Sequence, residues 1–117
     1  MNMLVKPLAY LLSLVFIVLG VAGFFTGSPL LVFQVDPLHN VIHLVSGLIG
    51  LYCARAGYPM ARAYLMLFGL IYAAVAVVGF IQGSTILGMM PVNMEDNLLH
   101  AGIAVACLLV GFGSKRA

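Results

Sequence analysis

The side chains best able to bind a metal or move a proton fall at two places in this sequence. His39 and His43 lie four residues apart, and Asp96 and His100 repeat that spacing later in the chain. Residues four apart on a helix project from the same face, so each pair can present two ligands side by side. If the two faces meet, four candidate metal ligands converge: His39, His43, Asp96 and His100.

Two kinds of cofactor fit these side chains. Three imidazoles and a carboxylate suit Zn²⁺ or another borderline divalent ion. Alternatively, the cofactor is a haem, and His43 and His100 are the cofactor-binding residues that would supply its two axial ligands. Asn40 and Asn97 each lie three residues before a histidine, and they are candidates to hold the ring nitrogens that do not face the metal.

A structural interpretation competes with both cofactor interpretations. The histidines and asparagines can bond to one another or to loop carbonyls, Asp96 can cap a helix, and His39 can face water. Ionisable groups inside a membrane span are nevertheless candidates for function by default. Three classes therefore stay open: a metal- or haem-binding protein, a scaffold or accessory subunit of a membrane complex, and a proton-handling or redox enzyme component. We assign no catalytic residue, and the sequence favours a protein that is not an enzyme.

The elements that carry these residues are membrane-spanning helices. Only 7% of the 117 residues are charged and 64% are hydrophobic, and the mean hydropathy is +1.20. A soluble domain has about a quarter charged residues, and a span needs about 20 apolar residues. The sequence predicts an all-α integral membrane four-helix bundle, a single transmembrane domain over residues 1–117. We expect its helices at residues 7–26, 37–56, 62–82 and 94–113.

The charges divide between the two sides of such a bundle. With four spans, the termini and the middle loop share one side, and the other two loops share the opposite side. The five cations fall on the first side: Lys6, Arg55, Arg62, Lys115 and Arg116. The three acids fall on the second side: Asp36, Glu95 and Asp96. Because cytoplasmic loops are enriched in Lys and Arg, the N- and C-termini are predicted to be cytoplasmic.

The sequence also repeats itself. Gly-Phe-Phe-Thr-Gly-Ser at residues 23–28 corresponds to Gly-Phe-Ile-Gln-Gly-Ser at residues 79–84, and residues 35–43 correspond to residues 92–100. This pattern predicts two tandem helical hairpins, repeat 1 at about 7–56 and repeat 2 at about 62–113. Hairpins in the same orientation are related by a parallel pseudo-twofold axis along the membrane normal.

Capping residues mark where two of the helices begin. Asp36 followed by Pro37 is typical of a helix N-cap and first position. Asn93 with Asp96 three residues later predicts a capping box. His43 and His100 each lie seven residues past a cap, which is about 10 Å into the span at 1.5 Å per residue.

The repeated motif resembles a known family. His-Asn-Val-Ile-His at residues 39–43 and Asp-Asn-Leu-Leu-His at residues 96–100 each follow a span that ends in Gly-Phe-x-x-Gly and a short loop. This arrangement is similar to the small bacterial four-span proteins of domain of unknown function 4383, although Asp36 stands where that pattern has Asn. The resemblance implies the four-span fold and a bacterial cytoplasmic (inner) membrane, and it carries no assigned activity.

The remaining features suggest partners rather than chemistry. The lipid bilayer is the expected surrounding, and no basic run indicates nucleic acid. A homo-oligomer or a partner in a membrane complex fits such a small bundle. We expect the tyrosines to be interface and packing residues: Tyr10, Tyr52, Tyr58, Tyr64 and Tyr72.

Overall fold

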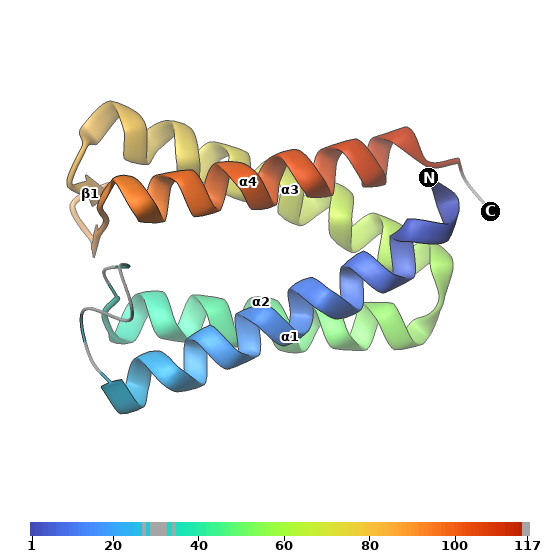
Figure 1. Cartoon of the computed structure of the whole chain (residues 1–117), viewed down its shortest axis with the longest axis horizontal. Helices are drawn as coiled ribbons and strands as arrows, with labels where there is room; N and C mark the ends of the chain where they lie inside the picture. The colour runs from blue at the N-terminus through green and yellow to red at the C-terminus, as the bar shows by residue number, and fades with distance from the viewer. Residues whose placement is uncertain (27, 29–32, 34, 116–117) are drawn as a thin grey trace.

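The computed structural model of this chain describes residues 1–26, 28, 33 and 35–115 (Figure 1). Arg116, one of the five predicted cytoplasmic cations, lies outside the described residues. Within them the chain forms, in order, α1 (Asn2–Thr26), α2 (Pro37–Ala56), α3 (Tyr58–Gln82), β1 (Thr85–Ile86), β2 (Met90–Pro91) and α4 (Met94–Gly113). All four helices are long and apolar enough to cross a membrane. The predicted all-α membrane bundle is confirmed, and the chain is a multi-pass membrane protein.

The bundle is built from two helical hairpins. α1 packs along α2 and α3 packs along α4, whereas the contacts between the hairpins are fewer and run mainly through α3 (Figure 1). The N-terminus, the α2–α3 turn and the end of α4 lie at one end of the molecule, and the β1–β2 hairpin lies at the other. The longest extent is 40 Å, enough to cross a hydrocarbon core about 30 Å thick.

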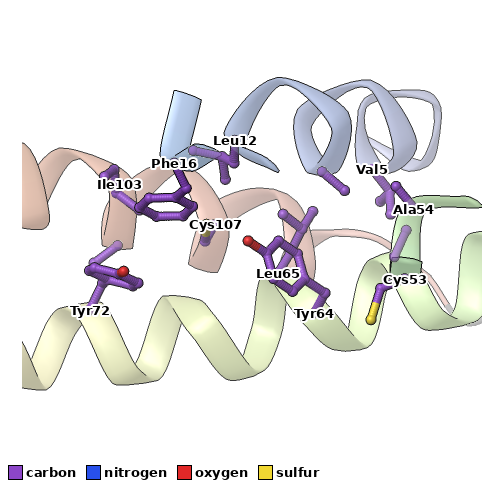
Figure 2. Packing of buried hydrophobic residues seen from close by; sticks show 13 residues of the cluster. Val5, Leu12, Phe16, Cys53, Ala54, Tyr64, Leu65, Tyr72, Ile103 and Cys107 are labelled. Carbon is purple, nitrogen blue, oxygen red and sulfur yellow. The ribbon is translucent and has the colours of Figure 1, made fainter. Parts of the chain in front are cut away.

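The surface and the interior suit a lipid surrounding. Large apolar side chains such as Leu11, Leu67 and Ile81 point outward and are 56 to 78% exposed. Exposed apolar area on this scale is incompatible with a monomeric soluble protein. The interior holds smaller residues such as Ala9 and Ala54, with a few large rings between the hairpins (Figure 2).

Two helices begin earlier than the sequence predicts. α1 begins at Asn2 rather than at residue 7, because the Asn2 carboxamide oxygen accepts a hydrogen bond from the Lys115 N–H at 2.8 Å and anchors this turn beside the end of α4. α3 begins at Tyr58 rather than at residue 62. Gly57 turns the chain within one residue at a φ of 124°, a conformation that glycine adopts at little cost.

The β1–β2 hairpin is the one element among the described residues that the sequence did not predict. Each strand has only two residues, too few for an alternating pattern to show. Leu87 and Gly88 have φ values of 53° and 69° and reverse the chain. Ile86, Met90 and Val92 are buried against α3, so the hairpin closes this end of the bundle.

An asparagine fits against a glycine in each hairpin. A Cβ added to Gly23 in α1 would overlap the amide oxygen of Asn40 in α2, and one added to Gly79 in α3 would overlap that of Asn97 in α4. These four residues are equivalent in the alignment of the two halves. The contacts match the predicted repeat, whose symmetry axis remains a prediction.

The close fit at Gly79 can be tested by adding one methyl group. We expect Gly79→Ala to lower the free energy of unfolding in detergent micelles by about 1–3 kcal/mol, because Asn97 is only 1% exposed and cannot swing away. Gly102→Ala is the matched control, since a Cβ there meets open space. Equal stability of the two variants would contradict the described contact.

Candidate metal centre

The start of α2 places two histidines on one helix face. The Asp36 side chain accepts a hydrogen bond from the His39 N–H at 2.7 Å, and Pro37 occupies the first turn. This confirms the predicted N-cap. The cap fixes where the helix begins, so His39 lies in its first turn and His43 one turn deeper on the same face.

The start of α4 places the third histidine. The Asn93 side chain accepts from the Asp96 N–H at 2.8 Å, and the Asp96 carboxylate accepts from the Asn93 N–H at 3.0 Å. This is the predicted capping box. His100 follows Asp96 by one turn, as His43 follows His39 in α2.

The three histidine rings form one buried cluster. His39 and His100 are 1% exposed and His43 is 3% exposed. Their ring centroids lie 4.3 Å apart for His39 and His43, 5.6 Å for His39 and His100, and 6.1 Å for His43 and His100. One nitrogen from each ring lies within 4.8 Å of the others. His43 and His100 therefore both point into the bundle interior.

Two aromatic rings lie beneath the cluster. Phe16 of α1 and Tyr72 of α3 stack with centroids 5.1 Å apart (Figure 2). Phe16 contacts His43 at 5.6 Å, and Tyr72 contacts His100 at 5.5 Å. Each aromatic ring therefore supports the histidine of its own hairpin and restricts how that histidine can tilt.

Some polar atoms of the cluster are buried without a hydrogen bond. Among the residues that the structure describes, neither nitrogen of His43 has a partner, and Nδ1 of His100 has none. A neutral imidazole carries one donor and one acceptor, and leaving such a group unsatisfied in a buried site costs about 1–3 kcal/mol. These nitrogens are available to a ligand.

Asp96 lies beside the histidines but has a different role in the structure. The group of nitrogens that can meet at one ion comes from the three histidines, while the Asp96 carboxylate is engaged in the capping box. It is 1% exposed and borders a small cavity that His43 also lines. Its carboxyl group is buried next to the cluster, and its role as a ligand remains a prediction.

Asn40 and Asn97 are likewise buried, at 2% and 1% exposure. Their amide oxygens face Gly23 and Gly79 of the neighbouring helices and have no hydrogen-bond partner in the described part of the chain. The structure therefore shows these side chains in helix packing. Their predicted contact with a histidine nitrogen remains a prediction.

The histidine cluster borders a cavity of about 470 Å³ between α2 and α3. All three histidines line this cavity, together with Ser46 and Tyr72. The hydroxyl oxygens of Ser46 and Tyr72 lie 3.1 Å apart in a hydrogen bond. Tyr72, which the sequence predicts to be an interface or packing residue, also places a hydroxyl group beside the site. It corresponds to Phe16 in the first half, and the added hydroxyl group was the one signal of this difference.

Comparison with known proteins identifies the family of this chain. The model of the family described as Domain of unknown function (DUF4383) matches residues 6–113. The chain belongs to this family. Neither curated proteins nor solved structures gave a match. Membership in DUF4383 supports the fold and assigns no activity, so a function for this member must be argued from its own side chains.

A haem fits this DUF4383 protein less well than a single ion. A porphyrin held between His43 and His100 would extend as a flat plate on all sides of the axis that joins them. The centroid of the His39 ring lies 4.3 Å from that of His43 and 5.6 Å from that of His100, so His39 occupies space that the porphyrin would need. The rings of Phe16 and Tyr72 contact the same two histidines and occupy more of that space. The close packing of these rings favours an ion.

The capping box at the start of α4 should be required to position His100. We expect Asn93→Ala to lower the free energy of unfolding by about 1 kcal/mol, because the Asp96 N–H loses the side-chain oxygen that accepts its hydrogen bond. Asn93→Ser keeps a capping oxygen and is the control. Amide hydrogen exchange around residues 93–97 should rise in the alanine variant, and unchanged protection there would argue against the described cap.

Proposed function

We propose that this DUF4383 protein binds one divalent metal ion of the zinc type through His39, His43 and His100. The observation that carries the proposal is the approach of one nitrogen from each ring to within 4.8 Å of the other two. Two of the ligands come from α2 and one from α4, so a bound ion would join the two hairpins where they share few helix contacts.

Small ring movements would complete the site. In a tetrahedral zinc site with bonds of about 2.0–2.1 Å, neighbouring ligand atoms lie ~3.3 Å apart. Nitrogens within 4.8 Å of one another reach that spacing by shifts of about 1 Å, which side-chain torsions can supply. Imidazole nitrogen suits zinc and its borderline neighbours better than it suits Mg²⁺ or Ca²⁺.

Three protein ligands would leave one coordination position open. Zinc sites with three protein ligands bind water or a substrate at the fourth position, whereas purely structural sites are closed by four. His39, His43 and His100 all line the cavity between α2 and α3. An external ligand would therefore approach the ion from that cavity.

The structural interpretation of the histidines is less well supported. Buried polar side chains in native proteins are generally hydrogen-bonded, and a histidine network would have to satisfy the rings it contains. Both nitrogens of His43 lack such a bond within the described residues. A metal ion would satisfy one nitrogen of each ring, and the nearby Asp96 carboxylate would offset part of the ion's charge.

We also propose that the chain lies in a bacterial cytoplasmic membrane with both termini in the cytoplasm. Lys6, Arg55, Arg62 and Lys115 belong to the end of the bundle that holds the termini and the α2–α3 turn. Asp36 and Asp96 cap helices at the other end. The positive-inside rule supports this orientation, which puts the histidine cluster near the outer surface.

The metal site predicts a defined stoichiometry. Purified full-length protein, stripped with a chelator and then titrated with Zn²⁺, should bind one ion per chain by calorimetry and elemental analysis. We expect His43→Ala and His100→Ala each to weaken binding by at least 100-fold, because two ligands remain. Cys53→Ala and Cys107→Ala test the two thiols and should bind as the wild type does. Unchanged binding in the histidine variants would refute the proposal.

A stability measurement separates the metal site from a histidine network. In the presence of chelator, we expect His43→Leu to raise the free energy of unfolding by about 1 kcal/mol, because two unpartnered nitrogens are removed from the interior. With Zn²⁺ at about 100 times its dissociation constant, the wild type should gain about 2.7 kcal/mol and the variant very little. A clear loss of stability of the metal-free variant would instead favour the structural network.

A further inference from the structure

The cavity beside the histidines is a groove whose accessible surface is almost wholly apolar. Its α2 wall includes Val41, Val45 and Ile49, and its α3 wall includes Phe68 and Ile71. Val41, Val45, Ile49 and Ile71 are 42 to 46% exposed, so the walls continue onto the surface that faces lipid. The groove is therefore open sideways to the bilayer.

Several residues that line the groove carry buried polar atoms, which small side-chain movements would bring to a bound head. His43 and His100 present nitrogens that have no hydrogen-bond partner in the part of the chain described. Ser46 and Tyr72 share one hydrogen bond between two hydroxyl groups, so one of their two protons remains to be donated. Both hydroxyl-bearing residues are 3% exposed. An oxygen ligand at the metal would find this donor beside it.

We propose that the groove binds a single long-chain carboxylate, a fatty acid taken from the bilayer, with its head as the fourth ligand of the metal. The inference rests on the proposed metal site. One carboxylate oxygen coordinates the ion, and the hydroxyl pair of Ser46 and Tyr72 donates to the head. The tail lies between α2 and α3 against Val45 and Ile49.

Charge favours an anionic head. Three neutral imidazoles leave a divalent ion with its full charge in a buried site, and buried charges need compensation. Asp96 lies next to the cluster, and in its ionised form it would supply one negative charge. The carboxylate of a fatty acid would supply the second, so the filled site would be close to neutral. A quinone or an ester head would leave one positive charge uncompensated.

Size and direction favour one chain. A cavity of about 470 Å³ is in the range of sites that bind one small-molecule ligand, about 300–1,000 Å³. A single acyl chain is a ligand of this size. From Val41 to Ile49 the α2 wall runs about 12 Å along the helix, from the histidine end toward the bilayer centre. A fatty acid in a membrane has the same direction, with its head at the interface.

The test uses the full-length protein in detergent micelles loaded with Co²⁺, whose visible absorption reports the ligands of the ion. Palmitate should change the spectrum with a saturable dependence, whereas methyl palmitate, which has the same tail without the anionic oxygen, should not. Acetate at the same concentration should also leave the spectrum unchanged. We expect Tyr72→Phe to weaken the palmitate response by about tenfold, the loss of one hydrogen bond to a charged group.

Two tryptophan variants test the groove itself. Val45→Trp fills the groove from a position that is 46% exposed, and Leu48→Trp places the same side chain on α2 at a position that is 52% exposed and outside this groove. Both should bind Co²⁺ as the wild type does. The palmitate response should fall at least tenfold in Val45→Trp and stay unchanged in Leu48→Trp.

The outcomes separate the two proposals. If Co²⁺ does not bind to the wild type, the metal site is wrong and this inference falls with it. If Co²⁺ binds and palmitate leaves its spectrum unchanged, the metal site stands and the fatty-acid site is overturned. An equal response to acetate, or to a quinol with a decyl tail, would also overturn it. Equal palmitate responses in the two tryptophan variants would exclude the groove as the binding site.

Discussion

The need to satisfy polar groups inside a bundle surrounded by lipid governs this structure. An imidazole that faced the hydrocarbon would have no partner for its nitrogens, and each unsatisfied group there costs several kcal/mol. His39, His43 and His100 therefore turn inward and meet at one end of the bundle. Within the described residues, nitrogens of His43 and His100 have no hydrogen-bond partner, so the constraint that gathers the rings also leaves these nitrogens able to bind a ligand.

Close helix packing is what lets these polar residues share one interior. Gly23 and Gly79 leave room for the amides of Asn40 and Asn97, so the two helices of each hairpin pack closely at these positions. Without a hydrophobic driving force between helices, such fits are the main source of association in lipid. The hairpins themselves meet less extensively. The histidines, Phe16 and Tyr72 lie where they meet, and this boundary is where a ligand can enter.

Much of this arrangement could be predicted from the sequence because it depends on short-range rules. Asp36 and the capping box of Asn93 set where α2 and α4 begin, and apolar length sets the spans. Spacing of four residues then put the histidines on common faces. The sequence could not show that Tyr72 and Ser46 meet across two helices, since that contact depends on how the hairpins dock. Nor could it show the β1–β2 hairpin, whose two-residue strands carry no periodicity.

The two halves of the chain differ at one position of the histidine cluster, and this difference sets how many imidazoles each hairpin contributes. In the alignment of the halves His39 corresponds to Asp96, so the first hairpin brings two imidazoles and the second brings one. A fourth imidazole at that position would complete a closed, fully charged site. Asp96 instead bonds to the Asn93 N–H and lies beside the cluster. In the proposed metal site, the open position would face the cavity between α2 and α3, which all three histidines line. The difference at this one position would therefore separate a site that can bind an external ligand from a closed structural site.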